Sequence, residues 1–195
     1  LIVNDDPSHL IDTINSIINK VDIIVTIGGV SMGPKDFTWI SLYKHYRPKY
    51  YIRGLRIHPG RSTSGMVIYG KPVINLPGLP QSTIAGSIFL LIPILNWLQG
   101  LEPCIKIPYI EAWSKEQVVI EKYYGFHRIR YVFIDSKDLS VKIMAKFDSY
   151  HVSPIAKTDG LVIIPPNKKI IEAGEKVRVY FFKPIHQYSF YEELP

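Results

Sequence analysis

Cysteine and long apolar runs are scarce in this sequence, and each scarcity excludes a class of protein. A single cysteine, Cys104, cannot form an intramolecular disulfide or a cysteine-based metal cluster within one chain, which favours the cytoplasm. The longest apolar run, Ile84 to Leu98, spans about 15 residues and contains Pro93, whereas a membrane span needs roughly 20 apolar residues. No basic and apolar leader opens the sequence, which therefore predicts a soluble protein without a membrane partner.

An initiating methionine is also lacking. The chain begins with Leu1-Ile2-Val3, which has the apolar character of a strand interior, so we expect a piece of a longer protein. Acidic residues are fewer than basic ones, 17 against 23, and the formal net charge is +6. This excess suits phosphate-rich or oxyanionic ligands but does not identify one. The remaining composition, 47% hydrophobic and 21% charged, is that of a globular protein with one large or two small domains.

The first hundred residues alternate strand patterns with helix patterns. Five apolar residues from Leu10 to Val21 follow helical spacing, and Asp6 before Pro7 is a natural helix start. Residues 22–27 are apolar after Asp22, as in a parallel strand covered on both faces, and end in Gly28-Gly29. Further helices are expected over residues 36–46 and 81–98, and further strands over 1–3, 50–57, 66–69 and 73–76. This alternation predicts a doubly wound α/β fold whose ligands bind at the carboxyl ends of the strands.

The second half has a different pattern. Short strand-like runs follow one another without predicted helices between them, at residues 117–121, 128–134, 139–145, 161–164 and 176–182. Such a series is typical of a small all-β barrel or sandwich. We therefore predict two domains, an α/β domain over residues 1–102 and an all-β domain over residues 103–195.

A glycine-rich loop, Gly28-Gly29-Val30-Ser31-Met32-Gly33, follows an apolar strand directly. Three glycines in six residues let backbone N–H groups approach a phosphate without obstruction by a Cβ atom. The loop lacks the lysine of a Walker loop and the spacing of a dinucleotide fingerprint. Taken alone, it is as consistent with a simple turn as with a phosphate site.

Its context is more specific. Thr26-Ile27 with this loop and Asp36 resembles the signature of the molybdopterin-binding domain, of MoaB/MogA type, which molybdopterin adenylyltransferases share with molybdotransferases such as the E domain of gephyrin. His58-Pro59-Gly60-Arg61 resembles the family's Lys-Pro-Gly-Lys, and Leu76-Pro77-Gly78-Leu79-Pro80 resembles its Leu-Pro-Gly-Asn-Pro. Only the molybdotransferase also has a β unit like the one that holds Phe126-His127-Arg128. The chain thus resembles the C-terminal part of a molybdopterin molybdotransferase over nearly all of residues 1–182.

The resemblance implies a three-layer α/β domain that lacks its first strand and helix, with two further domains preceding it. A sheet without that strand exposes an edge that an absent segment or a partner must cover, so we expect this piece to be inactive alone. Family members work as dimers whose clefts draw on both chains, which makes a homodimer the expected assembly.

The family binds adenylylated molybdopterin, releases AMP with the help of a divalent cation, and places molybdate on the dithiolene sulfurs. By resemblance, Asp36, Asp5 and Asp6 are the catalytic acids, and Asp36 with Asp5 holds Mg²⁺ against phosphate oxygens, for which carboxylates are suitable ligands. Two structural alternatives remain open. Asp6 is also a natural helix cap, and Asp36 is also a first-turn acid that the helix dipole favours.

The resemblance also divides the binding residues into two sets. The pterin and its phosphate are assigned to Thr26, Gly28, Gly29, Ser31, Gly33, Pro77, Gly78, Pro80 and Ser82. Molybdate, or tungstate of nearly the same size and charge, is assigned to His58, Arg61, Ser64, Arg128 and Ser149, because a tetrahedral dianion requires several cations and hydroxyls. His58 and Arg61 replace family lysines and Leu79 replaces an asparagine. His58 is only partly cationic at neutral pH.

Other functions also fit the residues. One is a module that binds molybdopterin or a partner without turning it over, and another is an adenylyltransferase, against which the β unit argues. Lys49-Tyr50-Tyr51 and Lys122-Tyr123-Tyr124 resemble stacking platforms for single-stranded nucleic acid. Tyrosine is also a good strand former, so we expect no nucleic-acid partner. His127 is interpreted as a structural hydrogen-bonding residue.

Overall fold

The computed structural model describes residues 1–30, 37–104, 107–120, 122–144 and 152–181. The chain forms two compact units. Unit 1 comprises Leu1–Leu55 and Gly60–Ile105, and unit 2 comprises Arg56–Pro59 and Lys106–Pro195. The sequence pattern placed residues 56–59 with the α/β half. They belong to unit 2 because β3 (Ile57–His58) pairs in parallel with β8 (His127–Asp135).

Unit 1 is built on a four-stranded sheet. Its strands are, in order across the sheet, β1 (Ile24–Ile27), β5 (Lys71–Leu76), β4 (Ser64–Ile68) and β2 (Tyr51–Arg53). The expectation of a parallel sheet is correct only for β1 and β5, because β4 is antiparallel to both of its neighbours. Tyr69 and Gly70 have φ of 50° and 79°, as in the two-residue turn that joins antiparallel strands.

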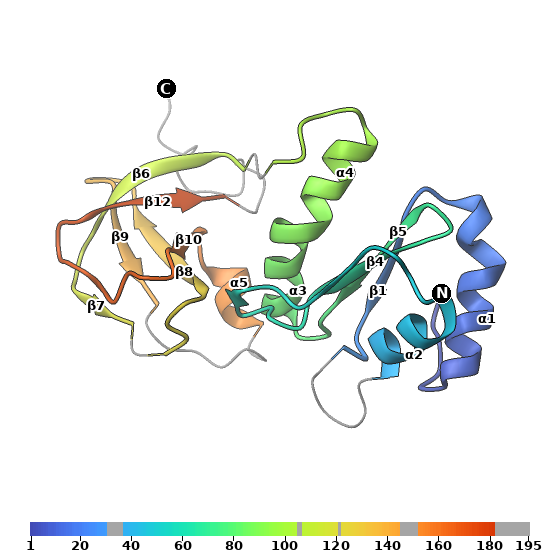
Figure 1. The fold of residues 1–195 in the computed structure, drawn as a ribbon. Coiled ribbons are helices and arrows are strands. Elements are labelled where there is room, and N and C mark those ends of the chain that lie inside the picture. Colours follow the sequence, from blue (N-terminus) through green and yellow to red (C-terminus); the bar gives the residue numbers. More distant parts are fainter. Residues whose placement is uncertain (31–36, 105–106, 121, 145–151, 182–195) are drawn as a thin grey trace. The chain divides into compact units, whose positions relative to one another are not determined.

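Helices cover both faces of this sheet, which confirms the three-layer α/β architecture (Figure 1). On one face lie α1 (Pro7–Ile17), which continues as the 3₁₀ turn η1 (Ile18–Lys20), and α2 (Phe37–Tyr46). The core that they form with the sheet consists of Leu10, Ile14, Ile18, Ile24, Trp39, Leu42, Met66, Ile68 and Val73. The apolar residues of α1 therefore face this core, as their helical spacing predicts.

The opposite face is covered by one long helix, expected over residues 81–98. It is continuous from Pro80 to Leu98 and consists of α3 (Pro80–Gly86), the π-helical turn η2 (Ser87–Leu91) and α4 (Ile92–Leu98). The Ile92 N–H donates to the Ser87 carbonyl, five residues back, just before Pro93, which has no N–H to donate. By length and composition alone this helix of 19 residues could cross a membrane, but core helices meet the same criterion. In its first half Gln81, Ser82, Ala85, Gly86 and Ile88 are buried.

Three local expectations for unit 1 are wrong. Residues 1–3 form no strand. β1 is not covered on both faces, since Val25 and Ile27 are 38% and 66% exposed. The strand expected over residues 50–57 is interrupted at Gly54, which has φ of +86°. A Cβ atom there would lie 2.9 Å from the Arg61 carbonyl oxygen, so the chain turns at a position that only glycine accommodates.

Unit 2 is a closed β-barrel, one of the two expected all-β forms. Its strands run in the order β10 (Gly160–Ile164), β12 (Lys176–Tyr180), β6 (Tyr109–Ser114), β9 (Ser140–Ile143) and β8, and β8 closes the barrel on β10. A separate pair joins β7 (Val118–Val119) to β11 (Ile170–Ile171). Three elements, β6, β11 and the short helix α5 (Ser153–Lys157), were not predicted from the sequence. The sequence of β6 has no apolar–polar alternation, because its exposed positions include Tyr109 and Trp113 and its buried positions include Ser114, so periodicity could not reveal that strand.

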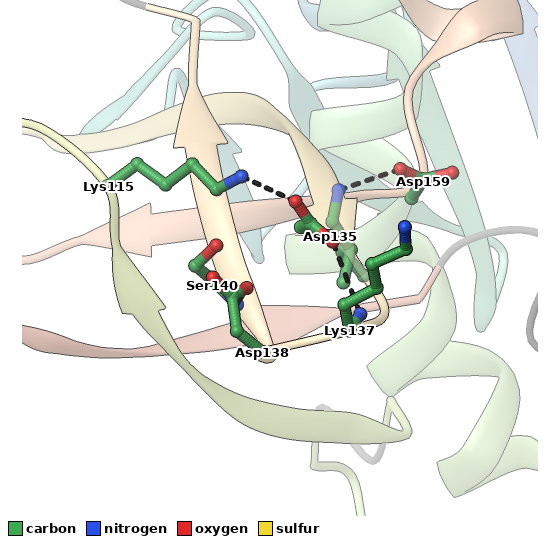
Figure 2. Close-up of polar contacts among 7 residues, drawn as sticks. Lys115, Asp135, Lys137, Asp138, Ser140 and Asp159 are labelled. Atoms are coloured by element: carbon green, nitrogen blue, oxygen red, sulfur yellow. Dashed lines mark hydrogen bonds and ion pairs between the residues drawn. The ribbon is translucent and has the colours of Figure 1, made fainter.

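Acidic side chains at one end of β8 are occupied by local contacts (Figure 2). The Asp135 carboxylate lies 2.6 Å from the Lys115 ammonium, and this hydrogen bond holds the pKa of Asp135 below its ordinary value. The Asp159 carboxylate accepts from the Ile134 N–H at 2.8 Å. These carboxylates therefore stabilise the barrel rather than form a cation site.

Candidate functional site

Two loops meet at the carboxyl ends of β1 and β5. The Gly28 N–H donates to the Leu76 carbonyl at 3.0 Å, and a Cβ atom on Gly78 would lie 3.5 Å from the Cα of Gly28. Gly28 and Gly29 have φ of 93° and 65°, which side chains disfavour. The two loops are thus in contact at the carboxyl ends of the strands, which is where α/β sheets bind their ligands.

The second loop is held by the helix that follows it. The Thr83 hydroxyl donates to the Pro77 carbonyl and, at 3.1 Å, to the Leu79 carbonyl. Pro80 occupies the first turn, and Ser82 is buried there. A first helical turn carries backbone N–H groups with no acceptor within the helix, and the helix dipole favours an anion beside them. The arrangement is therefore suited to a phosphate.

A series of hydrogen-bonded polar side chains crosses the sheet next to these loops. The Thr26 hydroxyl donates to Asn75 Oδ1 at 2.8 Å, and Asn75 Nδ2 donates to the Ser64 hydroxyl at 3.2 Å. Asn75 and Ser64 are both buried. Sequence reasoning missed Asn75, although a polar residue in the apolar run of β5 was a visible signal. Ser64, expected to bind molybdate, lies within unit 1 and is engaged by Asn75.

A cavity of about 570 Å³ lies beside β1 and reaches this loop junction. Four residues of the predicted site line it, namely Asp5, Thr26, Gly28 and Gly29. Its other lining residues are mainly apolar side chains of residues 1–3, α1 and β1. The structure thus brings one predicted catalytic acid and part of the predicted pterin set to one cavity. Asp36, Ser31 and Gly33 lie outside the described residues.

Asp6 has a different position from Asp5. Its carboxylate caps α1 by accepting the N–H groups of Ser8 and His9 at 2.8 and 2.9 Å. The hydrogen bond from the Ser8 hydroxyl, followed by that from the His9 backbone, holds the pKa of Asp6 below its ordinary value. The carboxylate is therefore engaged in starting the helix.

Replacing Asp6 by alanine is expected to lower the Tm at neutral pH by a few degrees, because two backbone donors lose their acceptor. The pKa of Asp6 is lower in the folded chain than its ordinary 3.8, so the stabilisation is complete above about pH 4 and is lost as the pH falls through the lowered pKa. The difference in Tm between the two proteins should therefore be smaller at about pH 2 than at neutral pH. An equal Tm difference at both pH values would contradict this. Asp12→Ala, an exposed change in the same helix, is the control.

Unit 2 contains a separate group of cations around β3 and β8. His58 stands opposite Arg128 in the parallel pair, and its ring stacks on Tyr123 with centroids 3.5 Å apart. Arg128 is fully buried, and its Nη2 donates to the carbonyls of Pro165 and Lys168. Its Nε and Nη1 atoms are buried without a hydrogen-bond partner among the described residues. Arg128 therefore anchors a loop and still has unused donors.

A second guanidinium lies close to this one. Arg130 follows on the same strand face, and its Nη1 donates to the Ile129 carbonyl at 2.9 Å. Burial, and then the charge of Arg128, lowers the pKa of Arg130. Neither arginine forms an ion pair within the part of the chain that the structure describes. A buried guanidinium beside a half-buried one, both without a counter-ion among the described residues, favours an anion. The alternating Arg128-Ile129-Arg130 was the signal for Arg130, which sequence reasoning missed.

The residues predicted to bind molybdate are divided between the units. His58 and Arg128 belong to unit 2, whereas Arg61 and Ser64 belong to unit 1. Ser149 lies outside the described residues. Within the described ranges, no group of three or more His, Cys, Asp or Glu side chains could hold a metal ion.

Comparison with known proteins identifies both units. Residues 1–97 match the family described as "Probable molybdopterin binding domain", and residues 121–182 match "MoeA C-terminal region (domain IV)". The chain belongs to the MoeA family. The order of these two regions along the chain confirms the predicted resemblance to the C-terminal part of a molybdotransferase.

Individual MoeA relatives agree with this assignment. The molybdopterin molybdenumtransferase of a Nostoc species is 24% identical over 190 residues, which cover 91% of this chain and 42% of the relative. That of Staphylococcus epidermidis is 26% identical over 198 residues, covering 98% and 44%. A solved MoeA structure from Pyrococcus horikoshii superposes with a TM-score of 0.73 and 28% identity, over 93% of this chain and 42% of that one. The chain thus spans less than half the length of these relatives.

Proposed function

We propose that this chain is part of a molybdopterin molybdenumtransferase, which inserts molybdate into adenylylated molybdopterin and releases AMP. The observation that carries the proposal is the joined pair of loops at Gly28 and Gly78, in a chain that also has the C-terminal MoeA region. An adenylyltransferase has the first region without needing the second, which favours the molybdenumtransferase. The parent acts in the cytoplasm, and the proposal includes no nucleic-acid or membrane partner.

The two loops bind the pterin phosphate through backbone N–H groups. Gly28, Gly29 and Gly78 allow close approach, and the first turn after Pro80 adds the positive end of a helix dipole. Thr26 and Ser82 flank these groups from β1 and α3. The contribution of the protein at this point is to position the phosphate while keeping the loop rigid through the Asn75 hydrogen bonds.

One described carboxylate, that of Asp5, supports a Mg²⁺ role for the acidic part of this proposed site. Asp5 is exposed on the wall of the cavity that reaches Gly28, and carboxylate oxygens are hard ligands suited to this cation. We assign Mg²⁺ to Asp5 and Asp36, and we give no metal role to Asp6 because its carboxylate caps α1. When bound, the cation would neutralise phosphate oxygens as AMP leaves.

Molybdate, as substrate, is assigned to basic residues of unit 2. Arg128 has two buried donors without partners, and Arg130 adds a second positive charge beside it. His58 belongs to the same unit, and Ser149 completes the proposed set. Tungstate would use the same residues because its size and charge are nearly equal.

A homodimer is also part of the proposal. Its support is the resemblance to a family of dimers, together with exposed apolar side chains at the end of the long helix. Trp97 and Leu101 are 62% and 58% exposed, and no residue of α4 is buried. Apolar surface of this kind is typical of contacts between chains.

Asp36→Asn in the full-length parent is expected to lower the rate of AMP release about a hundredfold, because the cation loses a charged ligand. Binding of adenylylated molybdopterin should remain measurable by calorimetry, since the loops that hold the phosphate are unchanged. Asp12→Asn is the matched control. Unchanged AMP release would remove Asp36 from the mechanism. Binding without any AMP release by the wild-type parent, with Mg²⁺ and molybdate present, would favour the non-catalytic binding module instead.

A further inference from the structure

The outer edge of β2 is unpaired in the described part of the chain. β2 ends the sheet of unit 1, and all three of its residues are exposed. The Tyr50 carbonyl accepts from the Val67 N–H at 3.0 Å. Because hydrogen-bonding direction alternates along an antiparallel strand, the backbone groups of Tyr51 and Arg53 point away from β4. This edge thus offers donors and acceptors to another extended chain.

An apolar groove follows the same strand on the sheet face opposite α2. It has a volume of about 380 Å³, and among its lining residues are Tyr50, Ile52, Val67, Leu90 and Ile94. Ile52 and Val67 are 45% and 37% exposed, which leaves their side chains available for contact. In an added strand, alternate side chains would point into this groove.

The surroundings of β2 are strongly basic. From Phe37 to Leu101 the sequence contains no Asp or Glu and seven Lys or Arg residues. Four of these, Lys44, Arg47, Lys49 and Arg53, lie in α2, β2 or the loop between them, and all are exposed. None forms an ion pair with a described residue. The charge at this edge therefore complements an acidic ligand.

Ring contacts distinguish a peptide from a nucleic acid. Trp39 stacks on Tyr43 with centroids 4.7 Å apart, and the Arg53 guanidinium lies 4.5 Å from the Trp39 centroid. Tyr51 meets Tyr43 edge-on at 5.0 Å. Trp39 and Tyr43 use their faces on one another, and the guanidinium of Arg53 lies over Trp39, so these two rings offer little face for bases to stack on. Two copies of this chain paired through β2 would bring the same cations together, which disfavours self-association.

We propose that the β2 edge binds an extended acidic segment of a partner protein by strand addition. Backbone groups of the segment pair with Tyr51 and Arg53, its acidic side chains meet Lys44, Lys49 and Arg53, and its alternate apolar side chains enter the groove. This docking function is independent of the molybdate chemistry.

The test uses a short fluorescein-labelled peptide of alternating glutamate and isoleucine, titrated into the purified full-length parent and followed by anisotropy. We expect saturable binding, weakened about tenfold or more in the Lys44→Glu, Lys49→Glu double variant, because two attractive contacts become repulsive. Lys20→Glu, at an exposed cation that ends η1, should bind like the wild type. A peptide with serine in place of isoleucine should bind about tenfold more weakly, since it cannot fill the groove.

Amide exchange measured residue by residue by NMR identifies the mode of binding. Peptide addition should slow exchange at Tyr51 and Arg53, whose N–H groups point outward, and leave Ile52 unchanged because it already faces β4. Absence of saturable binding, unaltered exchange at both outward amides, or tighter binding of oligouridylate than of the peptide would each overturn the proposal.

Discussion

Replacing Arg128 by alanine is expected to reduce the free energy of unfolding of unit 2 by about 3–5 kcal/mol. The guanidinium is fully buried and donates to two carbonyls, those of Pro165 and Lys168. Alanine leaves both acceptors with one donor fewer and leaves a cavity in place of a long side chain. Urea unfolding followed through the fluorescence of Trp113, which lies in β6 of this unit, measures the loss when Trp39 and Trp97 of unit 1 are replaced by phenylalanine in both proteins.

Arg128→Met separates packing from charge. Methionine fills much of the space without donating, so the expected loss is smaller, about 1–3 kcal/mol, and this variant should remain folded at room temperature. If the unpaired Nε and Nη1 donors of Arg128 serve molybdate, the anion will raise the Tm of the wild type but not of Arg128→Met. Equal stabilisation of both would exclude Arg128 from the molybdate site. An alanine variant as stable as the wild type would contradict its structural role.

Gly29→Ala is expected to reduce the free energy of unfolding of unit 1 by about 2–4 kcal/mol. Gly29 has φ of +65°, where a side chain costs about 1–2 kcal/mol, and its added Cβ would overlap with the buried Thr38 hydroxyl oxygen. Relief of that overlap must move the Thr38 side chain, the loop or the start of α2. Binding of adenylylated molybdopterin should therefore weaken as well, measured by calorimetry beside urea unfolding.

Two matched variants isolate the overlap from the backbone strain. Gly28 also has a positive φ, +93°, but a Cβ atom added there would meet no atom within 4 Å. Gly28→Ala therefore adds only backbone strain, and its loss of unfolding free energy should be smaller than that of Gly29→Ala. Thr38→Ala removes the obstructing hydroxyl, and in the Gly29→Ala background it should restore part of the stability. Failure of Thr38→Ala to restore any stability would show that the overlap is not the cause.

Local patterns predicted several elements of the fold well. The apolar spacing and Asp6-Pro7 predicted α1, and the runs near residues 161–164 and 176–182 predicted β10 and β12. Each depends on interactions within one element and its immediate neighbours, which the sequence displays directly. Fold class and family followed, because motif order along the chain is itself a property of the sequence.

Pairing between distant segments was predicted less well. Which strands pair with one another decides three features of the fold. These are the mixed sheet, the place of residues 56–59 in unit 2 and the closed barrel. Burial of Asn75 and Arg128 among hydrogen-bonding partners likewise became visible only in the fold. A strand pattern specifies which faces are apolar, but its partner and register are decided by packing of the whole domain.

The sequence by itself thus determined the glycine loop, the Pro77-Gly78 loop, their order and the two classes of domain. Only the tertiary structure decided that Gly28 and Gly78 lie in contact, that Asp6 caps a helix while Asp5 lines the cavity, and that the edge of β2 is open. The physical reason is the separation along the chain over which each kind of interaction acts. Helix and turn preferences arise from residues a few positions apart, whereas a site is assembled by contacts between segments about 50 residues apart, whose stability depends on everything packed around them.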